Sequence, residues 1–196
     1  MYYPLLNDSI DTGGKTVAIV DRVPRKSPKI MRRMYVKSLD AAQHKVQIVN
    51  PYFTPTHSIK KAIRTSIETW SRGGNNDSRQ IKTSPLPLMQ LFTLQTNSEK
   101  KGAEIYIYNG GFHHSKIMMV DERFCTVGST NLNSRSLHYD YEINAFILDL
   151  PTTAELGEVF QNDKLNSTIM TREEYKKRSV WRRFVGWFAH LFTPVI

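Results

Sequence analysis

Segments with the pattern of β-strands alternate along this chain with segments whose apolar residues recur at helical spacing, and this alternation limits the possible folds most. The strand-like segments are 16–21, 45–50, 103–108, 116–121, 124–127 and 141–149. Helical spacing is found over 29–43, 59–67 and 153–166. Interleaved strands and helices predict an α/β fold, with helices packed around a largely buried sheet.

The same pattern divides the chain into three parts. Residues 1–15 follow neither period and end in a Thr-Gly-Gly turn signal, so we expect a linker or arm there. Residues 16–168 form the predicted domain. Residues 169–196 combine Trp, Phe and Arg at helical spacing, which predicts a basic amphipathic helix. This helix could lie in a membrane interface or dock on the domain's own sheet.

Residues 69–99 interrupt the pattern, with no clean period where an α/β unit should supply a strand. One interpretation is a long exposed insertion, although loops of this length without structure are uncommon in compact domains. The other is a translated frame error. Back-translated with suitable codons and read in the other frames, the segment gives a helix end, a strand and an amphipathic helix. Resequencing the gene distinguishes the two interpretations.

The net charge indicates which partners the chain favours, and the cysteine content indicates which redox compartment suits it. The formal net charge of +9 favours polyanions, meaning nucleic acid or an anionic membrane surface. The single cysteine, Cys125, excludes an internal disulfide and suits a reducing compartment. We expect no cleavable signal peptide and no spanning helix, because no stretch approaches the roughly 18 apolar residues that a span requires.

The residues that carry chemistry lie between positions 112 and 146. His114 and Lys116 are two apart at a predicted strand start, so both side chains should point to one face. Ser129 and Asn131 follow the next strand and can return to the same edge, with Gly128 permitting a tight turn. An imidazole can act as nucleophile or general acid, while an ammonium and an amide neutralise phosphate oxygens. The pattern predicts a site that attacks a phosphodiester.

Two carboxylates accompany these residues. Glu142 can hold the second nitrogen of the His114 imidazole and fix its tautomer, whereas Asp121 suits a loop-fixing role. One imidazole cannot easily serve both faces of an in-line displacement, so the site needs a second copy. The spacing of His113, Asp121 and Cys125 matches no standard zinc site, and we expect neither a metal nor a cofactor.

The series His114-x-Lys116-x4-Asp121-x6-Gly128-Ser129-x-Asn131 resembles the HKD motif of the phospholipase D superfamily. The flanking segments are similar to the second, C-terminal half of bacterial cardiolipin synthases; they are 50–55, 110–116, 127–136 and 139–149. The resemblance runs from Thr16 to the C-terminus except for 69–99. It implies a mixed β-sheet with helices on both faces, as a single HKD-containing half.

The resemblance also implies roles for individual residues. His114 would serve as general acid and base, while a histidine of the first half becomes phosphorylated. Lys116, Ser129 and Asn131 would bind phosphate, and Glu142 would orient His114. Asp121 and Gly128 would be structural. The implied reaction transfers a phosphatidyl group between phosphatidylglycerol molecules, giving cardiolipin and glycerol, without metal or cofactor.

The implied partners follow from the same resemblance. They are an anionic phospholipid, the cytoplasmic face of a bacterial membrane, and a second HKD half supplied in cis or by a homodimer. The chain has neither a first motif nor N-terminal membrane helices, so it resembles an incomplete C-terminal half. Two alternatives stay open. One is a homodimeric single-motif phosphodiesterase or nuclease, with nucleic acid the less favoured substrate. The other is an inactive membrane-binding fragment.

Overall fold

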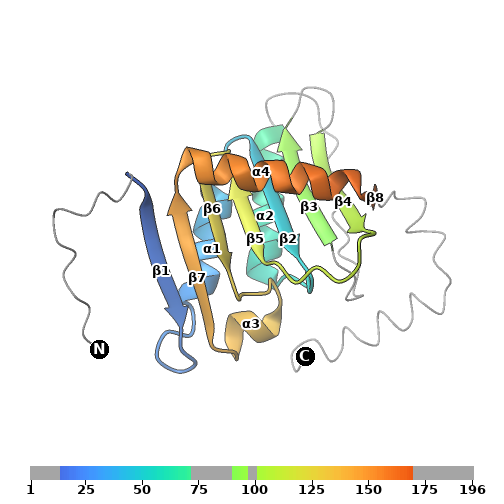
Figure 1. Ribbon diagram of the computed structural model, residues 1–196. Helices are drawn as coiled ribbons and strands as arrows, with labels where there is room; N and C mark the ends of the chain where they lie inside the picture. Colours follow the sequence, from blue (N-terminus) through green and yellow to red (C-terminus); the bar gives the residue numbers. More distant parts are fainter. Residues whose placement is uncertain (1–13, 72–89, 97–100, 170–196) are drawn as a thin grey trace.

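An antiparallel sheet of eight strands organises the part of the chain that the structure, a computed structural model, describes: residues 14–71, 90–96 and 101–169 (Figure 1). The strand order is β1-β7-β6-β5-β2-β3-β4-β8. The elements in chain order are β1 (Thr16–Arg22), α1 (Ile30–Ala41), β2 (Lys45–Asn50), α2 (His57–Ser71), β3 (Gln90–Thr96), β4 (Lys101–Tyr108), β5 (Ile117–Val120), β6 (Phe124–Gly128), α3 (Ser134–His138), β7 (Glu142–Leu148), α4 (Leu150–Leu165) and β8 (Ser167–Ile169).

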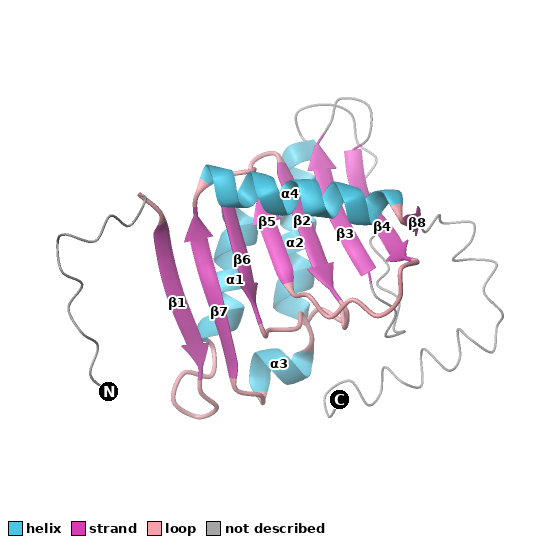
Figure 2. Cartoon of the chain, in the orientation of Figure 1, coloured by secondary structure: helices cyan, strands magenta, loops and turns pink. Residues whose placement is uncertain are grey.

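Helices cover both faces of the sheet. α1 and α2 lie against one face, and α4 crosses the other (Figure 2). Side chains alternate between the faces along each strand, as strand geometry requires. Met118 of β5 packs in the core under α1 and α2, whereas its neighbour Met119 packs with Phe160 of α4. The central strands β2 and β5 are therefore buried from both sides, whereas most residues of the edge strand β1 are exposed.

The predicted α/β fold with helices on both faces is confirmed. The implied mixture of strand directions is not observed, because every described pair of neighbouring strands is antiparallel. β3 accounts for this, because it lies between β2 and β4 and runs antiparallel to both of them. Short turns reverse the chain between β5 and β6 in the same way.

The interpretation of residues 69–99 as irregular needs correction, because β3 occupies part of this segment. Gln90 lies opposite Asn50 of β2 and Ile107 of β4. Hydrogen bonding to two neighbouring strands therefore defines β3, although the apolar residues of its sequence show no clear period. Two short elements, α3 and β8, were also missed. Residues 1–13, 72–89, 97–100 and 170–196 lie outside the described residues, and with them the predicted arm and most of the predicted C-terminal helix.

No helix within the described ranges is both long and apolar enough to cross a bilayer.

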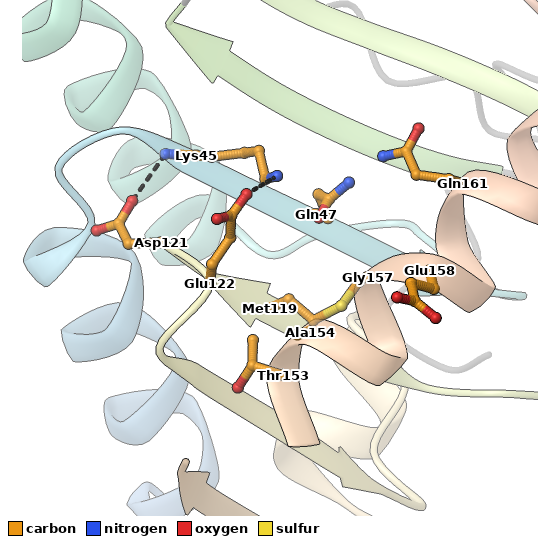
Figure 3. A pocket seen from close by; sticks show the side chains of 10 residues that line it. All are labelled: Lys45, Gln47, Met119, Asp121, Glu122, Thr153, Ala154, Gly157, Glu158 and Gln161. Atoms are coloured by element: carbon orange, nitrogen blue, oxygen red, sulfur yellow. Dashed lines mark hydrogen bonds and ion pairs between the residues drawn. The ribbon is translucent and has the colours of Figure 1, made fainter. Parts of the chain in front are cut away.

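Asp121 joins the β5–β6 turn to the connection between α1 and β2. Its carboxylate accepts hydrogen bonds from the backbone N–H groups of Gln43, His44 and Lys45, at 2.7, 2.8 and 2.8 Å. The residue has a φ of 50°, in the left-handed region that Asp tolerates better than most residues. The neighbouring Glu122 pairs with the Lys45 side chain at 2.6 Å, near the surface (Figure 3). Asp121 thus fixes the fold at the end of β5 remote from Lys116.

Replacing Asp121 by Ala should lower the free energy of unfolding by about 2–3 kcal/mol, because three backbone donors lose a charged acceptor. Glu122→Ala, the matched control, removes an exposed ion pair and should cost less than about 1 kcal/mol. Urea unfolding measures both. Equal losses for the two variants would contradict the structural role of Asp121.

Candidate active site

Four chain segments meet at one end of the sheet. They are the end of β2, the loop that leads into β5, the turn that leaves β6, and the start of β7. Antiparallel pairing of β5 with β2 and β6, and of β6 with β7, brings these ends together. The predicted residues His114, Lys116, Ser129, Asn131 and Glu142 all lie on them. Asp121 alone lies at the other end of β5, as expected for a structural residue.

Lys116 is buried although it carries an ammonium group, with 5% of its surface exposed. It immediately precedes β5, which starts at Ile117, one residue later than predicted. Its Nζ donates a hydrogen bond to the carbonyl oxygen of His114 at 2.7 Å. Burial lowers the pKa of Lys116, and the negative charge of Glu142 opposes this shift. The ammonium is therefore poorly solvated and retains donors for an incoming anion.

Glu142 is a buried carboxylate, and Ser129 is its described hydrogen-bond partner. The Ser129 hydroxyl donates to Oε2 of Glu142 and accepts from the backbone N–H of Ile143 at 3.0 Å. The backbone N–H of Ser129 donates to the Ile143 carbonyl, also at 3.0 Å. Ser129 is thus fixed from both main chain and side chain at the mouth of the site.

A second buried cation lies on the other side of Glu142. Arg22 faces Glu142 directly in the β1–β7 register and is 1% exposed. Its guanidinium donates to the carbonyl oxygens of Pro28 and Asp140. Burial lowers the pKa of Arg22, while Glu142 and Asp140 raise it. Arg22 is not predicted from the sequence, because an arginine at a strand end usually points to solvent.

His114 is exposed, in contrast to Lys116. Its ring lies against two aromatic side chains, with centroid distances of 5.5 Å to Phe112 and 6.5 Å to Tyr52. Within the described residues its nitrogens form no hydrogen bond, so the expected contact with Glu142 is not made. The reason is that Glu142 engages Ser129 instead. Both imidazole nitrogens are therefore available to exchange protons with a bound substrate.

Asn131 adds an amide with unused hydrogen-bonding capacity. Its Oδ1 is buried and has no hydrogen-bond partner among the described residues. Buried polar atoms are usually paired, and an exception at a site points to a ligand or a water. Rotation of the amide exchanges its oxygen and nitrogen, which are assigned rather than observed. Asn131 could therefore present an N–H to a phosphate oxygen.

Gly128 serves close packing rather than the predicted tight turn. A Cβ atom here would lie 2.3 Å from the Ile143 carbonyl oxygen and 2.4 Å from the Asn144 side chain. The missing side chain lets β6 and β7 approach at the point where Ser129 leaves the sheet. The absence of a side chain, and not conformational freedom, explains this glycine.

A buried polar network supports the turn that presents Ser129 and Asn131, and sequence analysis missed it. Thr130, between the two, donates through its N–H and its hydroxyl to Oδ1 of Asn144, at 3.3 and 2.6 Å. Asn144 Nδ2 in turn donates to Tyr35 and Thr126, both at 3.1 Å. The sequence pattern could have indicated this. Asn144 lies two residues from both Glu142 and Phe146 on the same strand, so it shares their inward face.

His113 connects the loop before β5 to α4. Its Nε2 lies 3.3 Å from the carboxylate of Asp163 in α4, and its ring is 5.6 Å from that of Tyr108.

Among the described residues no three His, Cys, Asp or Glu side chains are placed to hold a metal ion. The site is therefore built from one imidazole, one ammonium, a hydroxyl and an amide, which together can grip a phosphate.

Two cavities lie away from this site, around Asp121. One, of about 380 Å³, is lined by Lys45, Glu122 and α4 (Figure 3). The other, of about 530 Å³, lies beside α1 and includes His44 and Arg123. Neither contains a predicted site residue other than Asp121.

Comparison with known proteins agrees with this architecture. The family model described as "Cardiolipin synthase, PLD-like domain" matches residues 35–164. The cardiolipin synthase of Listeria welshimeri is 29% identical over 199 residues, which covers 100% of this chain and 40% of that protein. The chain thus spans about two fifths of the length of the curated relatives that it matches.

Solved structures show the same fold at low sequence identity. Phosphatidylserine synthase from Haemophilus influenzae has a TM-score of 0.61 and 15% identity, over 93% of this chain and 48% of that one. The phospholipase D family member Nuc from Salmonella typhimurium has a TM-score of 0.57 and 15% identity, over 80% of this chain and 98% of that one.

Gly128→Ala should lower the free energy of unfolding by about 3 kcal/mol, because the new methyl group overlaps β7. Gly157→Ala provides the control. A Cβ at Gly157 meets no atom within 4 Å, and in the helix interior alanine should stabilise by about 1 kcal/mol. Thermal or urea unfolding measures the difference, and a neutral Gly128→Ala would show that β6 and β7 are not in this close contact.

Glu142→Gln should lower the pKa of Lys116 further, since it removes the charge that opposes the effect of burial. As pH rises, Lys116 should then lose its proton earlier in the variant than in the parent. NMR titration of lysine side chains labelled at Cε reports this directly. Glu122→Gln, at the other end of β5, should leave the Lys116 titration unchanged. An unchanged or raised pKa of Lys116 in Glu142→Gln would refute the electrostatic link.

Proposed function

Because the chain belongs to the family of cardiolipin synthase phospholipase-D-like domains, we propose that it contributes one half of a site for phosphatidyl transfer. The observation that carries the proposal is that the exposed His114 lies two residues from the buried Lys116, whose ammonium donates to the His114 carbonyl oxygen. An ammonium deprived of water interacts strongly with a phosphate and with the charge that develops on it during transfer. The proposed substrate is phosphatidylglycerol, and the products are cardiolipin and glycerol.

The proposed chemistry has two steps. A partner histidine attacks phosphorus, and a P–N bond forms while the P–O bond to glycerol breaks. His114, protonated, gives its proton to the departing glycerol oxygen. It then takes the proton from a hydroxyl of a second phosphatidylglycerol. That oxygen attacks phosphorus, the P–N bond breaks, and the partner histidine is restored.

The other site residues stabilise the negative charge of the phosphate and hold the groups that contact it. Nζ of Lys116 moves from the His114 carbonyl to a non-bridging oxygen, where Ser129 and Asn131 supply further donors. Glu142 keeps Ser129 oriented and balances the positive charge of Lys116. These contacts strengthen as negative charge builds on the phosphoryl oxygens, so they favour the transition state over the bound substrate.

The second histidine has to come from another HKD-bearing half. The chain contains one such motif, so the partner is a further half in cis or a second copy related by a two-fold axis. The proposed location is the cytoplasmic face of a bacterial membrane, where the +9 net charge favours anionic phospholipid. We propose that residues 16–168 form the catalytic unit and 169–196 a membrane-binding helix.

A homodimeric phosphodiesterase is the second candidate. It is favoured by the alignment with Nuc, in which a chain matched over 98% of its length has the fold of this single half. In a homodimer, His114 of one copy would be the nucleophile and His114 of the other the acid. Nucleic acid is then a possible substrate, consistent with the basic charge.

A chimera tests the first proposal. The matched 199-residue segment of the Listeria welshimeri synthase is replaced by this chain, and cardiolipin is measured from phosphatidylglycerol vesicles. The chimera should form cardiolipin, His114→Ala should abolish it, and Lys116→Met should lower kcat by about a hundredfold or more. The isolated chain should show little or no synthase activity.

Controls separate the candidates. A Val159→Ser chimera, altered on the exposed side of α4, should retain activity. Treatment with a metal chelator should leave cardiolipin formation by the chimera unchanged. DNA cleavage by the isolated chain without lipid turnover would establish the second candidate instead. A folded chimera whose cardiolipin formation is unaffected by His114→Ala would contradict both.

A further inference from the structure

An exposed aromatic cluster borders the catalytic imidazole. It consists of Tyr52, Phe112 and His114, with centroid distances of 6.4 Å between Tyr52 and Phe112 and 5.5 Å between Phe112 and His114. Phe112 is 71% exposed and Tyr52 36%. Single exposed apolar side chains are common on protein surfaces. Here two large rings from distant parts of the sequence lie beside the imidazole that is proposed to transfer the proton.

The backbone holds Phe112 in this exposed position. Gly111 has a φ of 101°, and a Cβ on Gly110 would lie 2.5 Å from the Tyr108 ring, so the turn before Phe112 depends on both glycines. Asn109, at the base of the turn, is anchored by donating its backbone N–H to the Asn166 carbonyl at 2.9 Å. The exposure of Phe112 is therefore a fixed property of this turn.

Tyr52 is held as firmly from the other side. It follows β2 and precedes Phe53, which is buried in the core under α1 and α2. Asn50 accepts a hydrogen bond from the backbone N–H of Leu132 at 3.4 Å, which ties this turn to the loop of Asn131. The aromatic cluster and the phosphate-binding groups thus form one rim.

The composition of this rim favours one class of ligand. Lys116, the cation of this rim, is buried, and the segments 51–56, 109–115 and 129–134 contain neither lysine nor arginine. Arg135, which follows the last of them, is paired with Asp140 at 3.2 Å. A groove that follows a nucleic-acid backbone needs exposed cations beside its stacking rings. The boundary between lipid headgroups and acyl chains instead attracts aromatic side chains. In a phospholipid the phosphodiester lies next to this boundary, as His114 lies next to Phe112.

We propose that Phe112 and Tyr52 insert into the headgroup–acyl boundary of a phospholipid surface and present its phosphodiester to His114. The inference rests on the proposed function, because it takes the substrate to be a lipid in a membrane. It defines which surface of the domain meets the bilayer. The contact positions the substrate and takes no part in bond making.

A fluorescent label at position 112 tests insertion directly. Cys125 is fully buried, so Phe112→Cys in the full chain can be labelled selectively with an environment-sensitive nitrobenzoxadiazole dye; labelling of the parent protein measures any reaction at Cys125. On vesicles of equal parts phosphatidylglycerol and phosphatidylcholine, the emission should rise severalfold and be quenched by a lipid spin-labelled in its upper acyl chain. The same dye on Glu122→Cys, whose side chain is 72% exposed, should not respond.

Substitution tests the energetic contribution. Phe112→Ser should weaken vesicle binding by about tenfold, the loss expected for one buried aromatic side chain. Phe112→Trp should bind as tightly as the parent or more tightly. Val159→Ser, at a position 50% exposed on α4, should bind as the parent does. Circular dichroism confirms that each variant is folded.

The outcomes separate this inference from the proposed function, because insertion is measured without turnover. A label at 112 that stays in water on vesicle-bound protein overturns the inference, even if the chimera makes cardiolipin. A label that responds to a single-stranded oligonucleotide and not to vesicles also overturns it and assigns the rings to base stacking. Insertion at 112 in a chain without transfer activity supports the lipid contact and sinks only the proposed reaction.

Discussion

The ammonium group of Lys116 is kept from water at the edge of a sheet, and most of the site's construction follows from that constraint. Burial disfavours the charged form, so the group must be compensated nearby. Glu142 supplies the opposite charge to Lys116, and together with Asp140 it also compensates the buried Arg22. A poorly solvated ammonium attracts a phosphate more strongly than a solvated lysine does.

The rest of the fold holds this cluster beside an exposed imidazole. Gly128 lets β6 approach β7 closely enough for Ser129 to reach Glu142. The Asn144 network then fixes the turn between Ser129 and Asn131 from beneath. Asp121 anchors the other end of β5. His114 and the aromatic side chains beside it remain exposed at this end of the sheet.

Much of this could be predicted from the sequence, because the strands and helices with clear periods formed where expected. The strand 45–50 was predicted with the bounds observed for β2, and Asp121 lies at the end of β5 remote from Lys116. The predictions failed where contacts between distant parts of the chain determine the structure. β3 is defined by backbone pairing to its neighbours. Glu142 binds a serine rather than His114, a choice that depends on side-chain geometry across two strands.

The position of a bound phosphodiester tests the account most directly. Crystals of the protein soaked with a soluble short-chain phosphatidylglycerol should show its phosphate within hydrogen-bonding distance of Lys116 Nζ, Ser129 Oγ and the Asn131 amide. The His114 ring should lie against the glycerol oxygen, and the acyl chains should pass over Phe112. A phosphate bound elsewhere, or one held at this edge without contact to Lys116 and His114, would contradict the account.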